Sequence, residues 1–105
     1  MKVYSLQADL CKALAHPVRL EVIDLLSKRE HTVEELTKLT GSSQSNLSQH
    51  LAALRQQKLV HPRRAGMNVY YTLSTPKIAD ACGLIRKLLV ELLEDEHRVI
   101  KSMET

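Results

Sequence analysis

The feature that most constrains this chain is a pair of helix-boundary signals between Thr32 and Ser42. Thr32-Val33-Glu34-Glu35 is a capping box, in which Thr32 accepts from the Glu35 amide and Glu35 reaches back. It predicts a short helix over Val33–Thr40, after which Gly41 fits the left-handed position that follows a helix end. Ser42 can then cap a further helix that runs to about Lys58. Two helices joined by a tight turn containing glycine predict a helix-turn-helix.

Two more helices are expected before this unit. Leu6–Ala15 carries its leucines on one side and ends at His16-Pro17, because proline disfavours the helical conformation in the residue before it. Pro17 itself suits the first turn of a helix, which predicts a second helix over Pro17–Ser27.

A hairpin and a long helix are expected after it. Val60–Arg64 and Asn68–Leu73 have the composition of strands, and Gly66 lies at the turn between them, which predicts a wing. Thr75 and Pro76 open a last helix, over about residues 76–103, whose apolar residues repeat with a period near 3.5. A helix of about 25 residues is roughly 38 Å long, which is more than a small domain needs. The same helix of a second subunit is the expected partner for its apolar stripe.

These elements together predict a mainly α fold with a small β part, a winged helix-turn-helix in a single domain over residues 1–105. The last helix is expected to form a dimer interface. The chain has no Trp or Phe, so its core is small and aliphatic, and dimerisation would bury more apolar surface per subunit.

Charge is distributed unevenly along the sequence. From Leu36 to Ala79 there is no Asp or Glu, whereas the same stretch carries Lys38, Arg55, Lys58, Arg63, Arg64 and Lys77. The formal net charge of +3 therefore divides into +6 for this acid-free block and −3 for the remainder, which holds nine basic and twelve acidic residues. A continuous block without acidic side chains favours contact with a polyanion, above all nucleic acid.

The second helix of the predicted helix-turn-helix has one apolar and one polar side. Leu47, Leu51 and Leu54 fall together and are expected to face the core. The other side is small, polar and uncharged, which suits the major groove of DNA, where Gln and Ser can hydrogen-bond to base edges. Amides at the helix start, around Ser43, can hold a phosphate. The predicted DNA-binding residues are Ser43, Gln44, Ser45, Ser48, Gln49 and Arg55, with Arg63, Arg64 and Asn68 on the wing. The alternative is a solvated polar helix beside a solvated basic hairpin.

Over essentially its full length the chain resembles the ArsR/SmtB family of winged-helix transcriptional repressors. ALAHPVRLEVIDLL resembles the family's second-helix signature, HTVEELTKLTGSSQSNLSQHLAALRQQKLV its helix-turn-helix, and HPRRAGMNVYYTL its wing. The resemblance implies a homodimer that binds an inverted-repeat DNA operator, represses transcription and is released by an inducer. By motif match, it assigns base reading to Gln44, Ser45, Ser48 and Gln49.

The family's metal sites are not reproduced in this sequence. The positions of one site, between the final helices, hold Thr75, Lys77, Leu88 and Glu91, so a single ligand survives. The other site uses cysteines at the start of the third helix, where this chain has Thr32-Val33-Glu34. Zinc requires four N, S or O ligands in close array, so we expect no metal and no cofactor. Among the histidines, His16 is interpreted as a helix-junction residue, His50 as packed beside the recognition helix or against phosphate, and His31 and His61 as surface residues.

Two cysteines leave two alternatives open. Cys82 lies in the apolar stripe of the last helix and Cys11 adjoins that of the first. The resemblance implies that the first and last helices pack together at the dimer interface, which could bring the thiols close. One hypothesis is a dithiol switch, in which a thiol-reactive inducer changes the interface and releases DNA. Family members that sense sulfur species place their cysteines elsewhere, in the second helix and late in the last one. The alternative is that both are small buried hydrophobic residues.

Other classes of protein fit the sequence less well. No stretch is long enough for a signal peptide or a membrane span, and two distant cysteines do not make a disulfide framework, so we expect a cytoplasmic protein. A thiol redox enzyme would need a Cys-x-x-Cys motif, and the chain has neither that nor a glycine-rich phosphate loop. The sequence therefore predicts a DNA-binding repressor and no enzymatic activity. The alternatives are a regulator of this type without thiol or metal sensing and a winged-helix module that binds proteins.

Overall fold

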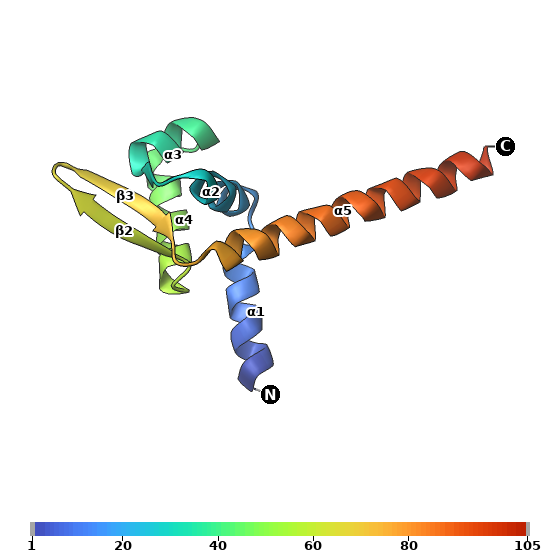
Figure 1. Cartoon of the computed structure of the whole chain (residues 1–105), viewed down its shortest axis with the longest axis horizontal. Helices are drawn as coiled ribbons and strands as arrows, with labels where there is room; N and C mark the ends of the chain where they lie inside the picture. The colour runs from blue at the N-terminus through green and yellow to red at the C-terminus, as the bar shows by residue number, and fades with distance from the viewer. Residues whose placement is uncertain (1, 105) are drawn as a thin grey trace.

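A computed structural model describes residues 2–104 and contains five helices and three short strands in this part of the chain (Figure 1). In chain order these are α1 (Lys2–Leu14), α2 (Pro17–Lys28), β1 (His31–Thr32), α3 (Val33–Thr40), α4 (Gln44–Gln56), β2 (Val60–Ala65), β3 (Asn68–Leu73) and α5 (Pro76–Met103). The order confirms the predicted winged helix-turn-helix. The predicted bounds of α3, β3 and α5 are those of the structure.

The other bounds differ by a few residues, for local reasons. α1 begins at Lys2, before the predicted Leu6, and ends at Leu14. α2 runs one residue further than predicted, to Lys28, and β2 likewise extends to Ala65. The largest error is at the start of α1. The end of α4 was also predicted too late, at about Lys58, which has a φ of 60°, and the Leu59 amide donates to the Leu54 carbonyl at 3.0 Å. The left-handed residue and this local backbone bond end the helix at Gln56.

The helix-turn-helix has the caps that its fold requires. The Thr32 hydroxyl accepts from the Glu35 amide at 3.1 Å, and the Thr32 amide donates to Oε1 of Glu35 at 3.3 Å, which confirms the capping box. Gly41 has a φ of 72°, in the region where glycine avoids the steric cost of a side chain. The cap of α4 is Ser43 and the predicted cap, Ser42, lies one residue before it, because the Ser43 hydroxyl accepts from the Asn46 amide at 3.2 Å.

The wing belongs to a three-stranded antiparallel sheet in the order β1-β3-β2. β2 and β3 pair from Val60 opposite Leu73 to Ala65 opposite Asn68. β1 pairs His31 with Tyr71 and Thr32 with Tyr70, and the sequence did not predict it, because two residues carry no periodic pattern. The wing is thereby joined to the turn between α2 and α3.

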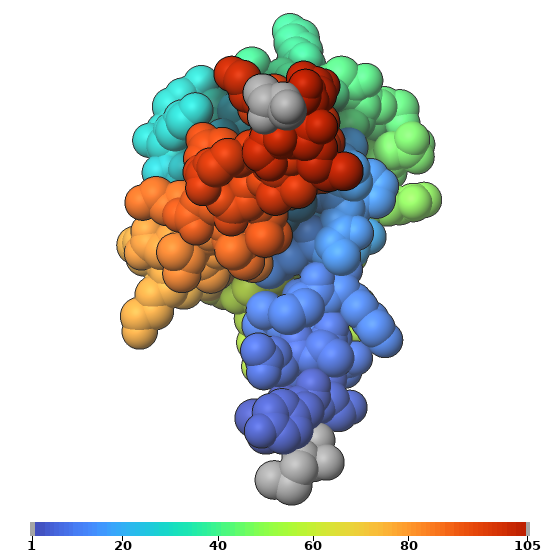
Figure 2. Space-filling view, turned by 90° about the vertical axis from the view of Figure 1, so that its right-hand side faces the viewer, coloured from blue at the N-terminus to red at the C-terminus, as the bar shows by residue number. Residues whose placement is uncertain are grey.

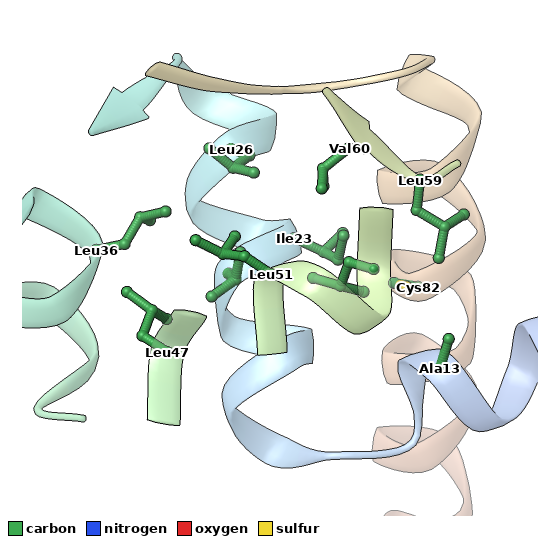
Figure 3. Packing of buried hydrophobic residues seen from close by; sticks show 11 residues of the cluster. Ala13, Ile23, Leu26, Leu36, Leu47, Leu51, Leu59, Val60 and Cys82 are labelled. Atoms are coloured by element: carbon green, nitrogen blue, oxygen red, sulfur yellow. The ribbon is translucent and has the colours of Figure 1, made fainter. Parts of the chain in front are cut away.

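The core lies where α2, α3 and α4 meet the base of the wing (Figure 3). Leu47, Leu51 and Leu54 of α4 are all buried, which confirms the predicted core face of that helix. They pack with residues from every other helix and from the start of β2, namely Ala13, Val22, Ile23, Leu26, Leu36, Leu59, Val60 and Cys82.

The two terminal helices project from this head. α1 extends to one side and α5 to another, and the space-filling view shows α5 pointing toward the viewer with α1 below it (Figures 1 and 2). α5 has 28 residues, so it is about 42 Å long, in a molecule whose principal extents are 63 × 38 × 23 Å. Of the expected apolar stripe of α1, only Ala13 is buried within the chain. In α5 only Cys82 is buried.

Candidate nucleic-acid interface

The face of α4 that points away from the core is fully open. The three leucines of the helix occupy the buried side, and every residue predicted to read bases, Gln44, Ser45, Ser48 and Gln49, is exposed. Ser43, Arg55, Arg63, Arg64 and Asn68 are exposed as well. This surface presents neutral hydrogen-bonding groups on a rigid helix held by buried leucines, which is what base recognition in the major groove requires.

The start of α4 adds backbone donors to this face. Ser43 occupies the cap, and its carbonyl accepts from the Leu47 amide at 2.9 Å, which is the first intrahelical bond. The amides of Gln44 and Ser45 belong to the first turn, whose N–H groups have no carbonyl partner within a helix. Together with the helix dipole, these donors favour an anion such as a phosphate at this end of α4.

The two arginines of the wing point to opposite faces of the hairpin, since successive residues of a strand alternate. Arg63 donates from Nε to Oε2 of Glu30 at 3.0 Å and also bonds through Nη2 to Oε1. Its guanidinium carbon lies 5.0 Å from the centroid of the Tyr70 ring. The hydrogen bond from Arg63 holds the pKa of Glu30 below its usual value, and the same bond raises the pKa of Arg63. Arg63 is therefore held by its own protein, in a charge pair with Glu30.

Arg64 faces α4 instead. Together with Arg55 of that helix it lines an open hollow of 360 Å³, whose other walls are Pro62, Val69 and Tyr71. No acidic side chain lines this hollow. Two arginines on an acid-free hollow between the recognition helix and the wing form a surface that can receive a phosphate group.

The basic residues of the acid-free block thus fall into two groups. Lys38 pairs with Glu34 at 3.5 Å on exposed α3, and Arg63 pairs with Glu30. In residues 2–104 the other four, Arg55, Lys58, Arg64 and Lys77, form no ion pair. The positive charge that remains available to a polyanion is concentrated on α4, the wing and the start of α5.

The two cysteines of the predicted thiol pair differ in their exposure within one chain. Cys11 is exposed on α1 and Cys82 is buried under α2, and both are free. Burial raises the pKa of the Cys82 thiol, and the nearby Arg86 offsets only part of this effect. Within residues 2–104 no three His, Cys, Asp or Glu side chains gather as a metal site would require, and no helix there is both long and apolar enough to cross a membrane.

Two polar clusters were not found from the sequence. The first is the Glu30–Arg63 pair; strand alternation could have separated Arg63 from Arg64, but it does not identify Glu30 as the partner. The second joins Arg19 of α2 to His50 of α4, 31 residues apart, and no local pattern signals it. The prediction for His31 was wrong: it is buried in β1 and hydrogen-bonded to Glu35 at 3.2 Å. His16 does lie at a helix junction, where its Nδ1 accepts from the Val18 amide and caps α2.

Comparison with known proteins identifies relatives of the same architecture. Residues 16–61 match the family model described as bacterial regulatory protein, arsR family. An uncharacterized HTH-type transcriptional regulator of Mycobacterium tuberculosis, Rv0081, is 37% identical over 102 residues, which cover 96% of this chain and 90% of the relative.

Solved structures agree with this match. The crystal structure of Rv0081 superposes with a TM-score of 0.85 at 38% identity, over 91% of this chain and 97% of that one. The homodimeric winged helix-turn-helix DNA-binding domain of Mb0332 from Mycobacterium bovis gives a TM-score of 0.81 at 33% identity, over 90% and 87% of the two chains. The transcriptional repressor BigR from Xylella fastidiosa gives 0.74 at 34% identity, over 83% and 89%.

Proposed function

Because this chain belongs to the arsR family of bacterial regulatory proteins, we propose that it is a homodimeric, cytoplasmic transcriptional repressor that binds an inverted-repeat DNA operator. The observation that carries the proposal is the exposed outer face of α4, which is uncharged, free of acids and flanked by the unpaired Arg55 and Arg64. It is a binding function with no chemical step. In this proposal, neutral residues provide sequence specificity and charged residues provide affinity for DNA.

Specificity is assigned to neutral side chains on α4. Gln44 and Gln49 present amides that can bond to adenine N6 and N7, and Ser45 and Ser48 present hydroxyls that can pair with several bases. Affinity is assigned to Ser43 at the helix start and to Arg55 and Arg64 beside the hollow, which contact the phosphate backbone. Asn68 sits at the wing turn, opposite Ala65, and is assigned a contact to backbone or minor groove.

The dimer is proposed from the apolar surface that α1 and α5 leave open. Large hydrophobic side chains remain exposed along both helices, including Val3, Leu6 and Leu10 on α1 and Leu84, Ile85, Leu88, Leu89, Leu92 and Leu93 on α5. Exposed apolar surface of this extent marks an interaction site. The homodimeric state of the Mb0332 domain supports the same partner for this chain. Two recognition helices of such a dimer would read half-sites about 34–36 Å apart.

The test begins with selection of duplexes from a random pool by the purified full chain, followed by fluorescence anisotropy on the selected sequence and a scrambled control. We expect an inverted repeat, a clear preference over the control and affinity that falls steeply with salt. Binding that is indifferent to both sequence and salt would overturn the proposal. Placing the selected site in front of a reporter gene tests the sign of regulation, and repression is the expected result.

The competing function is a winged-helix module that binds another protein. A partner protein would be expected to meet a bulky apolar or an acidic face, and the outer face of α4 offers neither. A chain that selects no duplex but retains its fold would favour this alternative.

For Cys82 we propose packing in place of a switch, and Cys11, which is exposed on α1, is assigned no sensing role. Cys82 is 7% exposed, and the rise in its pKa disfavours the thiolate, which is the reactive form of cysteine. Treatment of the reduced protein with diamide, polysulfide or arsenite should therefore leave operator affinity unchanged. A loss of affinity that disappears in the Cys11→Ser/Cys82→Ser double variant would establish the dithiol switch instead.

A further inference from the structure

Arg19 on α2 connects three helices through one guanidinium group. Its Nε donates to Nδ1 of His50, in the middle of α4, at 3.0 Å, and its Nη1 donates to the carbonyl oxygen of Ala13, in the last turn of α1, at 3.2 Å. Both bonds are partly buried. The residue thus ties the C-terminal end of α1 to the recognition helix.

His16 strengthens the same junction. Its Nδ1 accepts from the Val18 amide and caps α2, while its ring lies against that of His50 with centroids 4.3 Å apart and planes tilted by 45°. The carbonyl that Arg19 reaches is among those that a helix end leaves without an intrahelical donor, where a cation also meets the negative end of the helix dipole. The contacts of Arg19 and His16 therefore lie on the path from α1 to α4.

The bond between Arg19 and His50 requires a neutral imidazole. Nδ1 can accept only when it carries no proton, so His50 must hold its single proton on Nε2. Burial lowers the pKa of His50, and the neighbouring His16 and Arg19 lower it further. No carboxylate offsets this lowering. Protonation of Nδ1 would place one N–H group against another and add a positive charge beside Arg19.

We propose that Arg19 and His50 form a latch that positions the recognition helix relative to α1, and that this latch holds only while His50 is neutral. The inference rests on the proposed function, in which α1 belongs to the dimer interface and α4 reads DNA. His50 directly follows the base-reading Gln49, so a shift of α4 that breaks the latch would also displace the residues that meet base edges. A change at the dimer interface would reach α4 along this connected set of hydrogen bonds.

A different role for Arg19 is direct contact with a phosphate. The two roles differ in their salt dependence, because loss of a phosphate contact lowers the slope of log affinity against log salt by about 1. Loss of a positioning residue leaves that slope unchanged and reduces the preference for the specific sequence.

The chain offers matched variants for the test. His50→Leu removes the acceptor, whereas His50→Asn keeps an amide oxygen close to the place of Nδ1 but does not titrate. Arg19→Leu and the Arg19→Leu/His50→Leu double variant complete a double-mutant cycle. Each is measured by anisotropy on the selected duplex and its scrambled control, and by urea unfolding, at pH values from 8 to 5.

At pH 8 we expect Arg19→Leu and His50→Leu each to lower affinity for the selected duplex by about tenfold, as loss of a hydrogen bond to a charged group implies. The double variant should be no weaker than either single one, and the salt slopes should match that of the wild type. As the pH falls toward 5, the wild type should lose preference for its duplex more steeply than His50→Asn.

Three results would overturn the latch. The first is that the two substitutions change the free energy of unfolding additively, and the second is that the wild type and His50→Asn have identical pH profiles of duplex preference. The third is that Arg19→Leu lowers the salt slope while His50→Leu leaves the salt slope unchanged. The unfolding cycle requires no DNA, so it tests the latch even if the wild type selects no duplex. Failure of the wild type to select a duplex would count against the proposed function and not against the latch. If His50→Leu does not fold, the comparison of His50→Asn with the wild type still decides.

Discussion

The head of the molecule and its long C-terminal helix contain the same kind of sequence, leucines at helical spacing, but use it in different ways. Leu54 of α4 is 0% exposed, whereas Leu88 of α5 is 53% exposed. In the head, α2, α3 and the base of the wing cover the leucines of α4 (Figure 3). On α5 the chain itself provides no such cover beyond the first turns (Figure 1). Periodicity thus identifies which side of a helix is apolar, and it does not identify what covers that side.

The strongest test of this contrast is truncation of a leucine in the head. Leu54→Ala leaves a cavity in a fully buried site, and we expect the free energy of unfolding to fall by about 2–5 kcal/mol. Urea unfolding followed by circular dichroism measures the change. A loss well below this range would show that the head relaxes around the cavity and is less tightly packed than the burial of Leu54 implies.

The matched change on α5 is Leu88→Ala, which should affect association and leave the fold of the head intact. We expect weaker dimerisation by about 1–2 kcal/mol per subunit, as the removal of buried methylene groups implies. Sedimentation equilibrium measures the dimer constant, and circular dichroism at high protein concentration serves as the control for folding. An unchanged dimer constant would place the interface on another surface.

Sequence patterns predicted most of the local structure of the head, but they did not predict its long-range contacts or what covers the terminal helices. The capping box, Gly41 and the leucines of α4 specify local structure, so the helix-turn-helix could be predicted with nearly correct bounds. The strand β1 and the bonds of Arg63 and Arg19 depend on residues far apart in sequence, and nothing near either residue signals its partner. Leu6 and Leu10 were predicted as an apolar stripe, but their exposure depends on a neighbour that the sequence of one chain does not specify.

The two wing arginines provide a smaller contrast within the head. Arg64→Ala should lower affinity for all duplexes by about 1 kcal/mol and reduce the salt slope by about 1, because it removes one phosphate contact. Arg63→Ala should leave the salt slope nearly unchanged, because Glu30 already compensates that charge. Anisotropy at several salt concentrations separates the two, and equal reductions of slope would show that Arg63 leaves Glu30 to meet DNA.

The smallest expected effect is on the loss of stability at low pH. The hydrogen bond from Arg29, followed by that from the Thr32 amide, lowers the pKa of Glu35 from 4.5 to about 2. Since the folded-state pKa is below the unfolded-state value, Glu35 contributes stability above pH 4.5 that is lost as the pH falls toward 2. Urea unfolding at a series of pH values should show a shallower acid loss for Glu35→Gln and for Arg29→Ala than for the wild type. Identical slopes would mean that other carboxylates determine the acid response.

The central claim is that neutral side chains on the outer face of α4 read sequence while arginines supply affinity. The most direct measurement compares the wild type with the Ser45→Ala/Ser48→Ala variant on the selected duplex and on its scrambled control, at one salt concentration. The account predicts that the free-energy preference for the selected duplex over the scrambled one falls by about 0.5–1.5 kcal/mol for each base hydrogen bond that is lost. Affinity for the scrambled duplex is expected to be unchanged. An unchanged preference, or an equal decrease in affinity for both duplexes, would contradict it.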